Sequence, residues 1–202
     1  MEANTHVHRD DVASKLGMWL FIFTEILLFG GMFIVYSIFR YNHPVAFHLA
    51  GEELNDTMGL INTIILLVSS MTVAMSITAM QRGQVRRSMQ LLVITIILGL
   101  AFLVNKYFEW GAKFDHHIYP GSSFLRELGT GDTLFFGLYF MMTGLHALHI
   151  IVGLIILVWV AFYIQKKRTR PDKYVFLENG GLYWHLVDLI WIFLFPLFYL
   201  IH

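Results

Sequence analysis

Residues 133–164, TLFFGLYFMMTGLHALHIIVGLIILVWVAFYI, form a run of 32 without Lys, Arg, Asp or Glu. A hydrocarbon core about 30 Å thick is crossed by about 20 helical residues, so this run can span a membrane as a tilted helix. His146 and His149 lie near its middle, three positions apart and therefore on one helix face. Hydrocarbon offers no partner to their ring nitrogens, so we expect this face to contact protein or trapped water.

The composition agrees with a small protein that crosses the membrane several times. Of the 202 residues, 57% are hydrophobic and 14% are charged, and the formal net charge is zero. The absence of cysteine excludes disulfides, iron–sulfur clusters and thiolate metal sites. The first 15 residues are polar and the next apolar run is too long for a signal peptide, so the first helix is expected in the mature protein.

Five apolar runs predict an all-α polytopic membrane protein, a bundle of five transmembrane helices. We expect a polar tail over 1–14 and a single transmembrane domain over 15–202, with the segments 40–57 and 113–132 as loops. The predicted spans are about 17–39, 58–80, 88–109, 133–164 and 182–202.

The second predicted span carries a stripe of small side chains. Ser69, Thr72, Ser76 and Ala79 recur at three- and four-residue spacing. Small residues let membrane helices approach closely, so this stripe predicts a helix-packing face.

The third apolar run, 88–104, has only 17 residues and needs an extension to cross the membrane. We expect that extension over 105–110, where Lys106 and Glu109 stand one turn apart. An interfacial ion pair between them is the simplest prediction, with Trp110 at the same interface.

Two further spans contain ionisable groups. Glu25 is set roughly 12 Å along the first predicted helix, and an intramembrane carboxyl is costly unless it is partnered. Both a structural hydrogen-bonding role and proton handling remain open for it. His185 and Asp188 lie one turn apart on the last span, where the carboxylate can fix the imidazole tautomer. Pro196 is expected to kink that helix.

The basic residues predict the orientation. Of the 14 Lys and Arg residues, ten fall in the segments 1–15, 81–87 and 165–181, and four fall on the opposite side. By the positive-inside rule the N-terminus faces the cytoplasm and the C-terminus lies outside. Glu25, His146 and His149 then fall at similar depth. We predict that Glu25 hydrogen-bonds with His146 or His149, in a network that Asp188 can join.

Four segments in the same order resemble subunit III of the haem-copper oxidases, particularly cytochrome c oxidase, in its short five-helix bacterial form. They are KLGMWLFIFTEILLFGGMF (15–33), LINTIILLVSS (60–70), GLHALHIIVG (144–153) and YWHLVDLIW (183–191). Together they cover four of the five predicted helices.

The resemblance implies an accessory subunit of a proton-pumping terminal oxidase in aerobic respiration, in a bacterial plasma membrane. Its implied role is to stabilise the catalytic subunit and support proton uptake. Haem and copper are expected in the partner subunits I and II. This chain is expected to have no catalytic, metal or cofactor site; bound phospholipid and membership of a respiratory supercomplex fit the family, and nucleic acid does not.

The family's polar positions carry over to particular residues. Lys106 stands where Gln is more usual, and the two N-terminal helices of seven-helix members, which form one arm of a lipid cleft, are absent. The matched positions are Glu25, Glu109, His146, His149, His185 and Asp188.

Three alternatives remain. The chain's sequence hardly distinguishes a cytochrome c oxidase from a quinol oxidase, because subunit III does not touch the electron donor. A di-haem cytochrome would use His146, His149 and His185 as axial ligands, but three histidines do not supply two pairs. A proton-coupled transporter using Glu25 would be expected to show repeated halves or paired broken helices.

Overall fold

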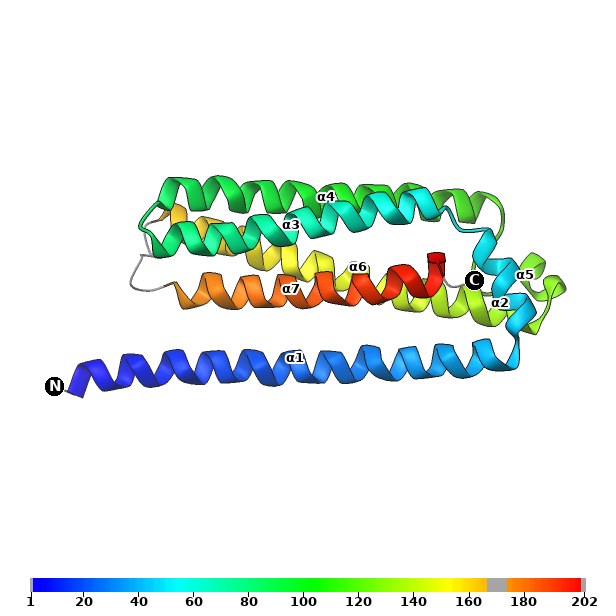
Figure 1. Ribbon diagram of the computed structural model, residues 1–202, viewed down its shortest axis with the longest axis horizontal. Helices are drawn as coiled ribbons and strands as arrows, with labels where there is room; N and C mark the ends of the chain where they lie inside the picture. Colours follow the sequence, from blue (N-terminus) through cyan, green and yellow to red (C-terminus); the bar gives the residue numbers. More distant parts are fainter. Residues whose placement is uncertain (1, 167–173, 201–202) are drawn as a thin grey trace.

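The computed structural model describes the backbone of residues 2–166 and 174–200, and their side chains apart from 2–12 and 126. The chain is helical almost throughout, as Figure 1 shows. The elements are α1 (Glu2–Asn42), α2 (Pro44–Glu52), α3 (Asp56–Gln81), α4 (Val85–Asp115), α5 (Ser123–Leu128), α6 (Thr130–Gln165), α7 (Val175–Phe195) and the π-helical turn η1 (Pro196–Leu200).

Five of the described helices are long and apolar enough to cross a membrane, which confirms the predicted number. The chain is therefore an all-helical, multi-pass membrane protein. The spans are Ala13–Asn42, Asp56–Gln81, Val85–Asp115, Thr130–Gln165 and Val175–Leu200.

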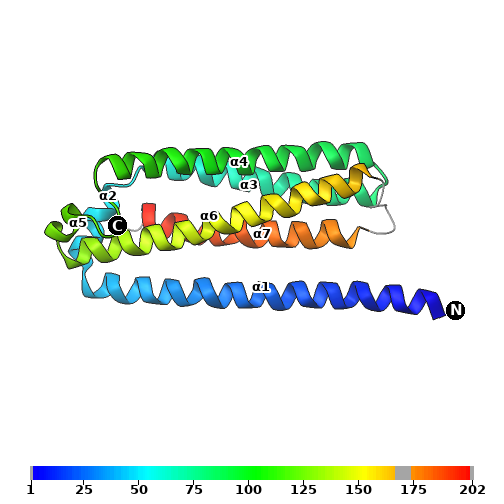
Figure 2. The same ribbon diagram turned by 180° about the vertical axis from the view of Figure 1, so that it is seen from behind.

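The five spanning helices run lengthwise beside one another (Figures 1 and 2). α3 and α4 form an antiparallel pair, α6 and α7 pack against this pair and each other, and α1 lies along one side against α6 and α7. The short helices α2 and α5 gather at one end, which we call the α2 end. The α3–α4 turn and the start of α7 lie at the opposite end, which we call the basic end.

Several predicted boundaries were wrong. The polar residues from Glu2 onward are helical and continuous with α1, and the membrane-spanning part of that helix begins at Ala13. Short helices occupy parts of both predicted loops, α2 in 40–57 and α5 in 113–132. The fifth span starts at Val175 rather than 182, because Glu178 and Asn179 find partners on α1: Glu178 pairs with Lys15 at 2.7 Å. The basic segment 167–173 and residues 201–202 lie outside the described residues.

The small-residue stripe on α3 is buried, as predicted, and it packs against α4. Thr72 and Thr95 hydroxyls lie 2.8 Å apart, and Ser76 and Ser88 hydroxyls 3.0 Å apart. These bonds satisfy the buried hydroxyls while the small side chains keep the backbones close. A turn of Gly83, at φ +73°, connects the pair.

The bundle core is aromatic, and its central tryptophan packs against glycines, which leave room for its ring. Trp184 is fully buried and donates from Nε1 to Ser69 Oγ at 3.0 Å. A Cβ at Gly99 would lie 2.6 Å from its ring, and one at Gly153 would lie 2.9 Å away. Two glycines therefore make the slot that lets α4 and α6 close around α7.

Candidate functional site

The site begins with the carboxyl of Glu25 on α1, which contacts the imidazole of His149 on α6. Oε2 and Nε2 lie 3.0 Å apart, and the two side chains are 14% and 9% exposed. The other ring nitrogen, Nδ1, lies 2.7 Å from the carbonyl oxygen of Leu145. The predicted hydrogen bond from Glu25 to this helix is thus confirmed, with His149 as its partner.

The hydrogen bonds of His149 determine the proton content of this pair. A carbonyl oxygen only accepts, so Nδ1 must carry a hydrogen and donate it to Leu145. The Nε2–Oε2 contact then needs one further proton, either on the imidazole as an ion pair or on the carboxyl as a neutral pair. In both states the pair is electrically neutral and holds one proton between two atoms.

α7 fixes the position of His149. The Tyr183 hydroxyl donates to the His149 carbonyl at 3.2 Å, and the Phe29 ring of α1 meets the imidazole edge-on at 5.5 Å between centroids. Three helices therefore converge on one proton-sharing pair near the middle of their spans.

His146 lies one turn away but does not join this pair. Its ring is fully buried between Phe102 and Trp191, with centroids 5.6 and 5.2 Å away. Neither ring nitrogen has a hydrogen-bond partner among the described residues. The predicted common network of these groups is therefore wrong, because the two imidazoles turn toward different helices.

A second cluster lies nearer the α2 end, around Lys106 and Glu109 of α4. Lys106 Nζ donates to Glu109 Oε2 at 3.1 Å, to Tyr199 at 2.9 Å and to Tyr139 at 3.3 Å, and lies 5.0 Å from the centre of the Trp191 ring. The hydroxyls of Tyr139, at 2.6 Å, and Tyr199 donate to Glu109 Oε1. The predicted ion pair is present.

This ion pair is buried within the helix bundle and is not exposed on its surface. Lys106 is 2% exposed and Glu109 7%. Tyr139 from α6 and Tyr199 from η1 close over it, and sequence reasoning missed both. The available signal was Pro196: without its N–H the helix cannot continue regularly, and the π-helical turn that follows carries Tyr199 inward.

His185 and Asp188 of α7 are close in sequence but do not pair. His185 Nδ1 lies 2.6 Å from the Ser70 hydroxyl of α3, so Ser70, not Asp188, fixes this ring. Asp188 is 3% exposed and neither carboxyl oxygen has a partner within the described parts of the chain. The predicted pairing is therefore wrong.

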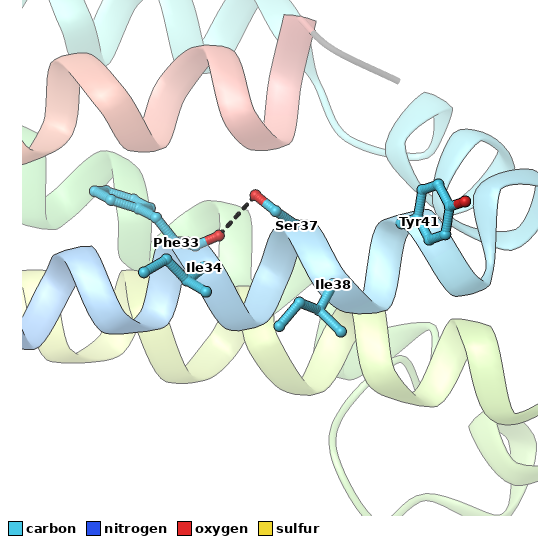
Figure 3. A pocket seen from close by; sticks show the side chains of 5 residues that line it. All are labelled: Phe33, Ile34, Ser37, Ile38 and Tyr41. Carbon is cyan, nitrogen blue, oxygen red and sulfur yellow. Dashed lines mark hydrogen bonds between the residues drawn. The ribbon is translucent and has the colours of Figure 1, made fainter.

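One hollow on the outside of α1 offers no comparable chemistry (Figure 3). It has a volume of about 400 Å³ and is lined by Phe33, Ile34, Ser37, Ile38 and Tyr41. The Ser37 hydroxyl donates to the Phe33 carbonyl one turn earlier at 2.8 Å and is thereby satisfied. This surface suits contact with lipid chains.

Taken together, five apolar helices around partnered carboxyl, imidazole and ammonium groups define a polytopic membrane protein with a polar core. Such cores inside a membrane mark proton-active or assembly functions.

Residues 2–202 match the family described as cytochrome c oxidase subunit III, and the chain belongs to this family. It is accordingly a subunit III of a haem-copper oxidase, an oxidoreductase complex.

The curated relatives include both kinds of terminal oxidase. Cytochrome c oxidase subunit 3 of Thermostichus vulcanus is 30% identical over 203 residues, covering 97% of this chain and 91% of the relative. Quinol oxidase subunit 3 of Bacillus spizizenii is 28% identical over 185 residues, covering 92% of this chain and 85% of the relative.

A third relative is a fused polypeptide. The haem-copper oxidase subunit I+III of Aeropyrum pernix is 30% identical over 194 residues, which cover 93% of this chain and 22% of the relative. The present chain thus corresponds to about a fifth of that longer protein.

Proposed function

We propose that this chain is the accessory, non-redox subunit III of a proton-pumping cytochrome c oxidase in aerobic respiration. It stabilises the haem-bearing subunit I and supports proton uptake, while haem and copper are held by subunits I and II. The fusion of subunits I and III in the Aeropyrum relative supports a direct contact between this chain and subunit I.

The observation that carries this proposal is the Glu25–His149 pair. A carboxyl in the middle of the membrane is costly alone, and here it shares one proton with an imidazole while remaining neutral overall. The proton can shift between the imidazole and the carboxyl without changing the net charge of the pair. This suits a subunit that maintains proton delivery rather than one that performs redox chemistry.

The surroundings of the histidines support the proposal that this chain holds no redox centre. Both ring nitrogens of His149 are engaged, by Glu25 and by the Leu145 carbonyl. His146 is enclosed by Phe102 and Trp191, and His185 is bonded to Ser70. Axial haem ligation would require one of these rings to turn away from its present neighbours.

The proposal includes a bacterial plasma membrane with the N-terminus in the cytoplasm. The Lys and Arg distribution supports this orientation, since the basic end carries the α3–α4 turn with Arg82, Arg86 and Arg87. Phospholipid bound along the exposed apolar helices and association with a respiratory supercomplex belong to the same proposal.

A quinol oxidase is the second candidate, favoured by the similarity to the Bacillus subunit. The discriminating feature lies on the partner: a copper-binding soluble domain on subunit II identifies the cytochrome c enzyme. Purifying the complex through this chain and assaying subunit II for copper decides between them.

The test of the proposed role is purification of the complex with Glu25→Gln or Glu25→Ala. We expect an unchanged haem spectrum with both. Glu25→Gln can still donate to His149 but has no exchangeable acid, so the complex should assemble and yet lose activity during turnover several-fold faster. Glu25→Ala should also weaken retention of this chain.

Thr24→Val is the matched control. Thr24 is exposed and its hydroxyl bonds only to Phe21 of its own helix at 2.7 Å, so this variant should behave like the unmodified complex. Loss of a haem band from an assembled Glu25 variant would refute the non-redox assignment. An unchanged lifetime in both Glu25 variants would refute the proton role.

A further inference from the structure

The outward face of α7 has a regular spacing. Every third or fourth residue along it is exposed or half-buried, whereas the residues between 183 and 191 outside this series are all buried. We call this face the α7 stripe. Its members are Leu182, His185, Leu189, Ile192 and Pro196. Alternating spacings of three and four are those of a helix that packs against another helix.

The stripe contains a polar group at mid-membrane depth. His185 lies ten residues into the Val175–Leu200 span, about 15 Å from its start at 1.5 Å per residue. Its ring is half-buried, and Ser70 of α3 occupies Nδ1. Nε2 has no hydrogen-bond partner among the described residues. An imidazole nitrogen at this depth is costly when it faces hydrocarbon.

A second polar side chain lies close to His185 in the same seam between α3 and α7. Asp188, one turn along α7, is buried beside the same Ser70. The α3–α7 seam therefore presents an imidazole at its surface, and a buried carboxyl lies beside the same Ser70. Lipid tails have no donors or acceptors to offer, so they do not suit this seam as a cover.

Another exposed groove, between α4 and α6, provides a contrast. It has a volume of about 680 Å³ and only apolar side chains line it, among them Leu100, Ile155 and Trp159. Acyl chains suit such a surface because no imidazole or carboxyl group lines it. The two faces differ in what they require from their surroundings.

We propose that the α7 stripe docks a transmembrane helix of the haem-bearing subunit, which presents a hydrogen-bonding side chain to His185 Nε2. The inference rests on the proposed function and adds to it the surface used for assembly. Leu189 and Ile192, 47% and 43% exposed, supply the apolar contacts on the same face. The Ser70 hydroxyl holds the imidazole in position for the partner.

Site-specific photocrosslinking in the intact complex tests this surface. Leu189→p-benzoylphenylalanine should crosslink to the haem-bearing subunit. The matched site is Ile97→p-benzoylphenylalanine on α4, also apolar, 58% exposed and well inside its span, which should crosslink to lipid. Crosslinks to subunit I from position 97 and not from 189 would overturn the docking surface and leave the proposed function intact. Failure of the unmodified chain to purify with a haem-bearing subunit would overturn the proposed function itself.

Two variants test the hydrogen bond. His185→Leu should shorten the retention half-time of this chain in detergent about 3- to 30-fold, the range expected for one hydrogen bond inside a membrane. Ser70→Ala removes the internal bond but leaves Nε2 for the partner, so its effect should be clearly smaller. Retention of His185→Leu equal to that of the unmodified complex, or an equal loss in both variants, would refute the proposed bond.

Discussion

The Glu25–His149 pair and the Lys106–Glu109 cluster both join a carboxyl to a base inside the membrane, yet they are built differently. The Glu109 carboxylate accepts hydrogen bonds from Lys106 and from two tyrosine hydroxyls, and the Lys106 ammonium also lies over the Trp191 ring. Side chains from α4, α6, α7 and η1 therefore form this cluster. Among the described residues, the Glu25 carboxyl bonds to His149 of α6, and α1 makes few contacts with that helix. In the most apolar part of α1, 17% of residues are buried, against 61% in α7. The enclosed cluster is suited to hold helices together, and the peripheral pair to exchange a proton.

The largest expected effect comes from Lys106→Met. Removing the ammonium leaves the Glu109 carboxylate buried without a cation, and such losses cost about 3–5 kcal/mol of stability. We expect a corresponding fall in the free energy of unfolding, measured with SDS in mixed micelles. Tyr107→Met, next in the chain but 75% exposed, is the control and should change little. Equal effects of the two variants would mean that the cluster does not stabilise the bundle.

Tyr199→Phe should have a smaller effect on the same cluster. It removes one hydroxyl from Glu109 and from Lys106 but preserves the ring that packs on Phe195. A hydrogen bond to a charged group contributes about 1.5–3 kcal/mol, and the same unfolding assay measures it. Combined with Lys106→Met, the loss should be less than additive, because both variants remove partners of one carboxylate.

The peripheral pair should show a weaker coupling. In a double-mutant cycle of Glu25→Leu and His149→Leu, we expect a coupling energy of about 0.6–2 kcal/mol, typical of hydrogen bonds within membranes. Thr24→Val combined with His149→Leu provides the additive reference. A coupling as large as that within the Lys106 cluster would remove the distinction between a structural and an exchangeable site.

The smallest effect is expected on the outer side of α1. Ser37→Ala removes a hydroxyl that bonds only to its own helix, so the free energy of unfolding should change by less than about 0.5 kcal/mol. The retention of the chain in the complex should also be unchanged. A large effect in the complex alone would show that a partner occupies the hollow of Figure 3.

The sequence was informative wherever a polar group stood alone in an apolar run. It predicted the five spans, the packing stripe on α3 and the bond from Glu25 to α6, because the cost of an isolated carboxyl or imidazole requires a partner. It also predicted that Lys106 and Glu109 pair, because one turn of helix brings them together.

The predictions that were wrong concern contacts between helices, and these contacts depend on how each helix is rotated about its own axis. Ser70, Tyr139 and Tyr199 carry neutral hydroxyls, which do not stand out in apolar runs, and only the packed structure shows which ionisable group each one meets. His185 and Asp188 share a turn, but α3 offers a hydroxyl to the imidazole while the carboxyl turns inward. Sequence spacing gives proximity along one helix and does not give the neighbours across the interface.

The π-helical turn after Pro196 has a consequence for how this protein is made. Tyr199 follows Lys106 by 93 residues and Tyr139 follows it by 33, so during synthesis the ammonium enters the membrane before either hydroxyl exists. Until α6 inserts, Glu109 is the only one of these three partners that is present, and Tyr199 is the last of them to arrive. Insertion of α7 and η1 therefore completes this cluster, and the Lys106 ammonium reaches its full set of partners only at that stage.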